Sequence, residues 1–165
     1  MVSAYCSSRI WTIAVRGSQP QVGDVVQFTL PNGRYAYGRI LQDASVAFYS
    51  GTTSEPDQPP IGSRDYQFVV GVYDDVLSSE DVPVVGHDPA QSPEDDWPPP
   101  YRVRDPISGA IRIYHHEHMR AATPEEGEGL EPAAVWDFHH LIDRLTGVRQ
   151  GLRCIKDLDC DSRPD

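Results

Sequence analysis

The sequence predicts a mainly β (α+β) fold: a twisted antiparallel sheet or a small, partly open barrel, with one C-terminal amphipathic helix. Three observations support this prediction. Apolar and polar residues alternate over several short segments of the first half, as in strands with one buried face. The 165 residues include 15 prolines and 13 glycines, which indicates many turns. One segment near the C-terminus has helical spacing instead.

Five segments of the first half have the alternation of strands. β-branched and aromatic residues stand at every second position, which is typical of a half-buried strand. The residues concerned are Trp11, Ile13 and Val15; Val26, Phe28 and Leu30; Tyr35, Tyr37 and Leu41; Val46 and Phe48; and Tyr66, Phe68, Val70 and Val72. Strand character resumes over 101–104 and 110–118, on either side of a turn at 105–109.

The hairpin over residues 24–41 is the strongest local feature. Its turn is Pro31-Asn32-Gly33, in which the proline presets φ and the glycine supplies the left-handed residue that rejoins the strand. Gly38 interrupts the second strand and marks either a bulge or the close approach of another segment. Such a curved meander suits a small barrel or a sheet wrapped on itself.

Residues 132–146 are predicted to form the helix. Pro132 fits the first helical position and Gly147 the position just past the end. The apolar face, which should pack on the sheet, consists of Ala134, Phe138, Leu141, Ile142 and Leu145. We therefore expect one β-rich domain over 1–148 that includes this helix, and a polar, flexible tail over 149–165.

The chain is acidic, with 25 Asp and Glu residues, 14 Lys and Arg residues and a formal net charge of -11. A field of this sign repels nucleic acid and anionic membranes and attracts cationic surfaces, although acidity also serves solubility alone. The acids are concentrated in the second half, since residues 81–140 contain twelve of them and four arginines. Most of the twelve stand in two loops, 86–100 and 124–131.

These two acidic loops are the predicted partner-binding surface. Long loops in a compact domain tend to be functional, and a cationic protein would be steered towards them, although a run of acids is also typical of a solvated face. Trp97 is expected either to anchor the partner or to fold back over the core. The predicted contact residues are Glu94, Asp95, Asp96, Trp97, Glu125, Glu126 and Glu128. The alternative surface is an exposed sheet face that carries Tyr35, Tyr37 and Tyr49.

No pattern in the sequence indicates catalysis or a cofactor. A nucleophile elbow, a P-loop and a dinucleotide fingerprint are all absent from it. The histidines at 115, 116, 118, 139 and 140 lack the spacing of a zinc site, so no metal is expected. The cysteines, Cys6, Cys154 and Cys160, are expected to be reduced thiols of a cytoplasmic protein. We expect neither a signal peptide nor a membrane helix.

Residues 22–41, VGDVVQFTLPNGRYAYGRIL, resemble the opening of immunity protein family 26, a group of bacterial immunity proteins of polymorphic toxin systems. The shared features are a Gly-Asp-Val start, a Pro-Asn-Gly turn and a Tyr-x-x-Gly-Arg second strand. They stand here at Gly23, Asp24, Val25, Pro31, Asn32, Gly33, Tyr35, Gly38 and Arg39. The segments 47–49 and 68–72 also fit, so the resemblance extends over residues 20–120.

The resemblance implies a mostly β protein that binds and neutralises a cognate toxin inside the producing cell. It brings no established functional residues with it. The acidity favours a basic toxin domain, for example a nuclease with a cationic groove. We expect the protein to be a monomer or to form a 1:1 complex. Two alternatives stay open: a small barrel module that binds a regulatory partner, and a metal-dependent enzyme that uses the histidines.

Overall fold

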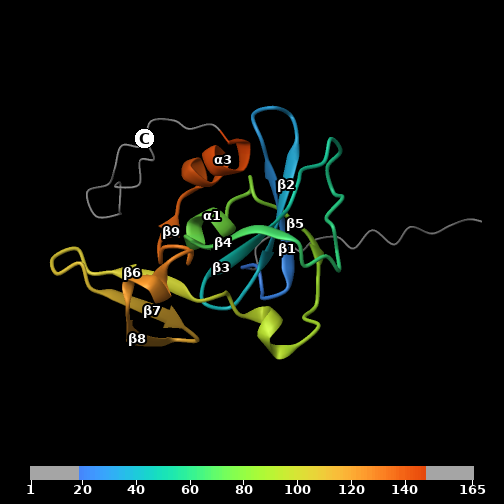
Figure 1. The fold of residues 1–165 in the computed structure, drawn as a ribbon. Helices are drawn as coiled ribbons and strands as arrows, with labels where there is room; N and C mark the ends of the chain where they lie inside the picture. The colour runs from blue at the N-terminus through green and yellow to red at the C-terminus, as the bar shows by residue number, and fades with distance from the viewer. Residues whose placement is uncertain (1–18, 148–165) are drawn as a thin grey trace, which may run out of the picture.

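A computed structural model describes residues 19–147, and its largest element is an open six-stranded sheet (Figure 1). The strands lie in the order β5-β1-β2-β3-β4-β9. Their bounds are β1 (Asp24–Thr29), β2 (Tyr35–Ile40), β3 (Ser45–Tyr49), β4 (Tyr66–Val72), β5 (Val84–His87) and β9 (Val135–Trp136). β1 to β4 form an antiparallel meander, β5 pairs antiparallel with β1, and β9 pairs parallel with β4.

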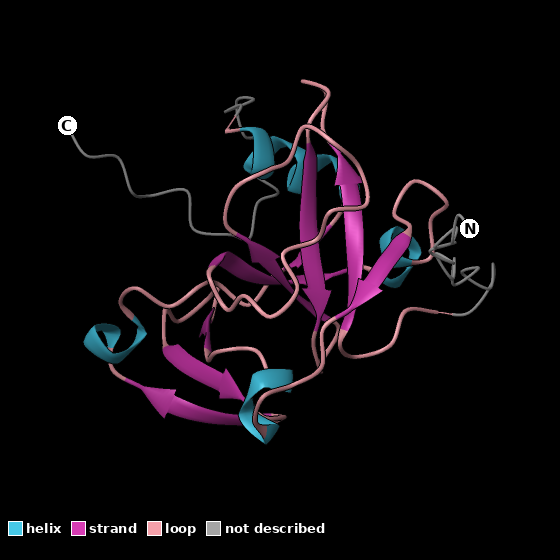
Figure 2. Cartoon of the chain, turned by 90° about the vertical axis from the view of Figure 1, so that its right-hand side faces the viewer, coloured by secondary structure: helices cyan, strands magenta, loops and turns pink. Residues whose placement is uncertain are grey.

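A second, three-stranded antiparallel sheet lies beside the first and is not continuous with it (Figures 1 and 2). It consists of β6 (Tyr101–Arg104), β7 (Ile111–His115) and β8 (His118–Ala122), followed by the short helix α2 (Pro124–Gly127). The outer edge of β6 is covered, because Arg102 N–H donates to Glu131 O at 2.8 Å and Ala133 N–H donates to Arg102 O at 2.7 Å. Neither sheet closes into a barrel, so the predicted mainly β fold is confirmed in its open-sheet form.

The predicted first hairpin is confirmed in its turn and its register. Gly33 N–H donates to Leu30 O at 2.9 Å, and Leu30 N–H donates to Arg34 O at 2.8 Å. Gly33 has a φ of 76°, which glycine adopts without a steric penalty. β1 and β2 pair without a bulge at Gly38, where an added Cβ would lie 2.5 Å from Val46 Cγ1. Of the two predicted reasons for this glycine, close approach of the neighbouring strand is therefore the right one.

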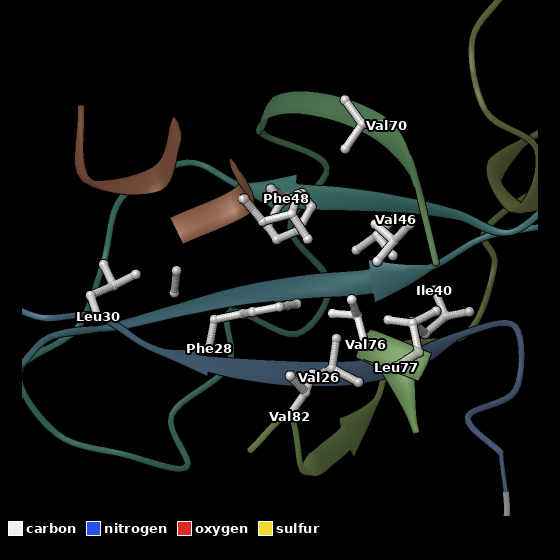
Figure 3. Close-up of a cluster of buried hydrophobic side chains, with 13 residues drawn as sticks. Val26, Phe28, Leu30, Ile40, Val46, Phe48, Val70, Val76, Leu77 and Val82 are labelled. Carbon is white, nitrogen blue, oxygen red and sulfur yellow. The ribbon is translucent and has the colours of Figure 1, made fainter. Parts of the chain in front are cut away.

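One face of the large sheet carries the main hydrophobic core. Helices α1 (Asp74–Leu77) and α3 (Phe138–Thr146) contribute side chains to it (Figure 3). The Phe48 ring lies 5.3 Å from that of Phe28 and 4.8 Å from that of Phe68, measured between centroids. The core residues are Val26, Phe28, Leu30, Ala36, Ile40, Val46, Phe48, Val70, Val72, Val76, Leu77, Val82 and Leu141. Burial of each larger side chain contributes about 1.5–3 kcal/mol to stability.

The predicted start of the C-terminal helix, Pro132, is wrong. α3 begins at Phe138, because the Asp137 side chain accepts a hydrogen bond from His140 N–H at 2.9 Å and so caps the helix there. The preceding residues are extended, since β9 pairs with β4 through Gly71 with Val135 and Val72 with Trp136. Ala134 is accordingly not on the helix. The predicted end is right: Gly147 follows the last turn with a φ of 69°.

The prediction of one strand over 110–118 is also wrong, because the chain reverses at His116 and Glu117. These residues have φ values of 49° and 63°, and they join β7 to β8 in a two-residue hairpin turn. Histidine and glutamate are not typical residues of such a turn, so the sequence did not predict a separate strand β8. The predicted strand at 11–15 and the tail at 149–165 lie outside the described residues. No helix within 19–147 is both long enough and apolar enough to cross a membrane.

Candidate partner-binding site

The second face of the large sheet is buried as well, but it carries polar and charged side chains beside apolar ones such as Val25. Arg39, Tyr49 and Asp88 are 0%, 1% and 2% exposed. Tyr37 is buried there too, and its hydroxyl accepts a hydrogen bond from Gln58 N–H at 3.1 Å. The predicted exposed tyrosine face is therefore wrong for Tyr37 and Tyr49: both are covered, because two long loops contribute polar groups that bond to this face.

Arg39 holds the segment 88–96 against this face. Strand alternation turns the Arg39 side chain away from the hydrophobic core, to the face opposite Ile40. Its guanidinium donates from Nε to Asp88 O at 2.7 Å, from Nη1 to Asp95 O at 2.8 Å and from Nη2 to Asp96 Oδ1 at 2.6 Å. Three charge-assisted bonds thus fix both ends of the acidic segment over β2.

Asp88 and Arg64 complete this network. Asp88 Oδ2 accepts hydrogen bonds from Tyr49 Oη at 2.6 Å, from Arg64 Nη1 at 2.9 Å and from Gly62 N–H at 3.0 Å. Arg64 Nε also donates to Asp95 Oδ2 at 3.1 Å. Burial by itself raises the pKa of Asp88, but the bonds from Tyr49, Gly62 and Arg64 outweigh it and hold that pKa below its usual range. We name the five residues Arg39, Arg64, Asp88, Asp95 and Asp96 the ion-pair clasp.

Two of the predicted contact residues, Asp95 and Asp96, belong to the clasp. The backbone N–H of Gln91, at 2.8 Å from Asp95 Oδ2, and then Arg64 lower the pKa of Asp95. Asp96 pairs with Arg39. Both carboxylates are therefore engaged within the protein and hold the loop in shape. Their contact with a partner stays a prediction.

A hollow of about 280 Å³ opens beside the clasp. Its floor is apolar and comes from the large sheet, with Leu41, Ala47 and Val69. The 3-10 helix η1 (Pro93–Asp96) and the residues after it supply one wall, which includes Glu94 and Trp97. His115, at the end of β7, lines the hollow as well, so both sheets contribute to it.

Glu94 and Trp97 meet the turn of the second sheet at the rim of this hollow. The Trp97 ring lies 4.6 Å from the His116 ring, and Glu94 Oε2 lies 3.3 Å from His116 Nε2. Trp97 is half-buried and packs against the second sheet. It does not cover the main hydrophobic core. The Glu94 side chain is 74% exposed and lies outside the clasp, which leaves its carboxylate accessible to a partner.

The other predicted contact residues, Glu125, Glu126 and Glu128, lie at the far end of β7. Gly127 of α2 packs on Ile111, the first residue of β7, whereas Glu94 lies beside the turn that follows His115. Four strand residues separate these ends by about 13 Å. The structure thus divides the predicted surface into two acidic groups at opposite ends of one strand.

Within the second group, the three carboxylates differ in their surroundings. Glu126 Oε2 accepts from Thr123 N–H at 2.9 Å in a capping box, and Glu126 Oε1 pairs with Arg120 at 2.9 Å. Glu125 and Glu128 are exposed. Glu126 therefore stabilises the first turn of α2, although its side chain is 43% exposed.

Sequence reasoning did not predict the hydrogen-bond network of Arg39, Arg64, Asp88 and Tyr49, although Arg39 was named as a family position and Tyr49 as part of the alternative surface. The available signal was the position of Arg39 in an alternating strand, where a charged residue on a covered face requires partners. Among residues 19–147, no group of three or more His, Cys, Asp or Glu side chains is placed to hold a metal ion. The rings of His115 and His116 instead pack against each other in a tilted arrangement, with centroids 4.0 Å apart.

The covered second face, the clasped loop and the hollow together are the candidate site of a β-rich protein. Comparison with known families shows that residues 21–110 match the family described as Immunity protein 26. The match covers 90 of the 165 residues, so the chain belongs to the immunity protein 26 family. No curated protein and no solved structure matches the chain significantly.

The family match confirms the resemblance, which was expected over residues 20–120, and gives it the bounds 21–110, a range that contains β1 to β6. It contains all five residues of the clasp as well as Glu94 and Trp97. Membership supports a role as an immunity protein, which implies binding of a cognate toxin. His115 and the acids of α2 lie beyond the matched range.

Proposed function

We propose that this protein neutralises a bacterial toxin by binding the toxic domain directly, with the hollow and its rim at the centre of the contact. The family match over residues 21–110 is the observation that carries the proposal. The protein acts as a monomer in the cytoplasm of the producing cell and forms a 1:1 complex. The toxin domain is basic, and a nuclease with a cationic groove is the first candidate.

The geometry of the acidic segment supports this site. Arg39 and Arg64 hold the segment through ion pairs at 2.6, 2.9 and 3.1 Å, so that little conformational entropy remains to be lost on binding. Beside this fixed backbone stand a half-buried Trp97 and an exposed Glu94. An aromatic anchor in a hollow, bordered by charged residues, is the usual anatomy of an interface centre.

The net charge of -11 supports the proposed sign of the partner. An acidic protein attracts a basic domain at long range, which raises the association rate more than the affinity. The effect should weaken with salt, because the Debye length is about 8 Å at physiological ionic strength.

Growth of bacteria tests the function. The toxin gene next to this chain's gene is expressed alone or together with it, and the immunity protein should restore growth. Equal killing in both strains would contradict the proposed function.

Charge reversal then tests the site, and the structure selects the residues. Glu94→Lys and Glu128→Lys reverse carboxylates outside the clasp, one at each end of β7. Reversal of Asp95 or Asp96 would instead break the clasp and confuse binding with folding. Glu80→Lys is the matched control: it makes the same charge change at an exposed residue just after α1, which contributes to the opposite face of the sheet.

We expect Glu94→Lys to slow association by about 3–10-fold and to reduce its salt dependence, with a smaller effect for Glu80→Lys. The rate constants are measured by stopped-flow fluorescence at two salt concentrations. A larger effect of Glu128→Lys would place the contact at the α2 end of the second sheet. Equal rates for all three variants and the wild type would exclude both ends.

A further inference from the structure

We infer that the hollow beside Trp97 receives a lysine or arginine side chain of the toxin. This inference rests on the proposed function and specifies what the site binds. The hollow combines an apolar floor, an aromatic wall and a carboxylate at its rim. In a lysine or arginine side chain, the apolar stem would contact the floor, and the cationic head would contact the aromatic wall and the carboxylate.

The size and the walls favour a side chain over a small-molecule ligand. The hollow has a volume of about 280 Å³, below the range of about 300–1,000 Å³ that is typical of pockets for small molecules and cofactors. Leu41, Ala47 and Val69 offer apolar contacts to a methylene stem. The indole of Trp97 is the ring type that interacts best with a cation.

The charge around the hollow selects a cation over an anion. Arg64 lines the hollow, but it is paired with Asp88 at 2.9 Å and with Asp95 at 3.1 Å. The clasp as a whole contains two guanidiniums and three carboxylates, and Glu94 adds a fourth carboxylate, so the net charge is -2 with the histidines neutral. An entering carboxylate or phosphate would therefore be repelled, whereas an ammonium or guanidinium would be attracted.

Glu94 is the carboxylate that can pair with the incoming cation. Asp95 Oδ2 already accepts bonds from Gln91 N–H and from Arg64 Nε. The Glu94 side chain is 74% exposed, lies outside the clasp and lines the hollow. Because the Glu94 side chain is mostly exposed, an ion pair formed there is weak by itself, and it adds to the contact of the cation with the Trp97 ring.

The first experiment measures the Kd between the full chain and the toxin domain encoded by the adjacent gene, by titration calorimetry. Trp97→Ala should weaken binding by about 30-fold or more, and Glu94→Gln by about 3–10-fold. Glu128→Gln, at the other end of β7, is the matched control and should change Kd by less than about twofold. Thermal unfolding shows whether each variant is folded, and the exposed Glu94→Gln keeps the test valid if Trp97→Ala is not.

The second experiment identifies the occupant. The full chain is titrated with arginine amide and, as an uncharged control of similar length, with norleucine amide, while NMR follows the Trp97 indole N–H and the Leu41 and Val69 methyl groups. Arginine amide should shift these signals, and Glu94→Gln should reduce the shifts. Equal shifts with both amides, or none with either, would overturn the inference.

The two experiments separate the possible failures. A toxin that binds the wild type and every variant equally well would overturn the inference but leave the proposed function intact. A toxin that does not bind the wild type would contradict the proposed function, and the amide titration would still decide what the hollow accepts. Self-association of the protein that Trp97→Ala abolishes would make a second copy the occupant and would also overturn the inference.

Discussion

Replacement of Arg39 by methionine should destabilise the protein more than any exposed charge change. The side chain is fully buried and donates three hydrogen bonds at 2.6–2.8 Å. Methionine retains the apolar stem but leaves Asp88 O, Asp95 O and the Asp96 carboxylate without their donor. Removal of one partner of a buried pair costs about 3–5 kcal/mol. Asp96 is 31% exposed, so water can solvate it, and we expect the lower half of that range.

Urea unfolding followed by tryptophan fluorescence measures this loss. Arg34→Met is the matched control, because Arg34 is exposed and donates to Thr52 at the surface; it should cost less than about 1 kcal/mol. Amide hydrogen exchange should also become faster over 88–97 in Arg39→Met, because the segment loses its anchor. A loss in Arg39→Met no larger than in Arg34→Met would refute the role assigned to the clasp.

Three further predictions concern the sheet and its polar face. Gly38→Ala should cost about 1–3 kcal/mol in urea unfolding, because its Cβ would lie 2.5 Å from Val46 Cγ1; Val46→Ala should recover most of that loss, and no recovery would contradict the contact. Tyr49→Phe should cost about 1.5–3 kcal/mol, since Asp88 loses a donor. Tyr66→Phe should be nearly neutral, since within residues 19–147 its buried hydroxyl has no hydrogen-bond partner. A larger loss of unfolding free energy in Tyr66→Phe than in Tyr49→Phe would contradict both expectations. Because the pKa of Asp88 is lower in the folded than in the unfolded protein, its stabilisation is complete above the unfolded pKa of about 3.9 and is lost as the pH falls through the folded pKa. The unfolding free energy should therefore decrease more on acidification in the wild type than in Asp88→Asn, and equal decreases would count against the bond network.

The meander of β1 to β4 was predictable because each strand has a regular period of two. The alternation could not say which face is the core, since both faces are covered: Val25 and Val26 point to opposite sides and are both 0% exposed. Tyr37 and Tyr49 look like surface residues for the same reason. The start of α3 was missed because β9 binds the free edge of β4, and a two-residue parallel pairing has no sequence signature.

Part of the candidate site was predictable from the sequence. The acidic loop with Glu94 and Trp97 was recognised because an aromatic and several acids stand in a long proline-rich segment. The pairing of Arg39 with Asp96 joins residues 57 positions apart, and a single sequence does not reveal such contacts. From the sequence, Asp95 and Asp96 were therefore expected to be accessible to a partner. In the fold they form ion pairs with Arg64 and Arg39 instead.

The order in which strands join the large sheet affects how the chain folds as it is synthesised. β1 to β4 are neighbours in sequence and can pair as soon as they emerge from the ribosome. The strands that protect the two edges come later, since β5 ends at His87 and β9 at Trp136. Until then the meander has open edges, which can pair with other unfinished chains. Addition of β5 and β9 therefore shortens the open edges of the sheet and lowers its tendency to aggregate, a role separate from any contact with a toxin.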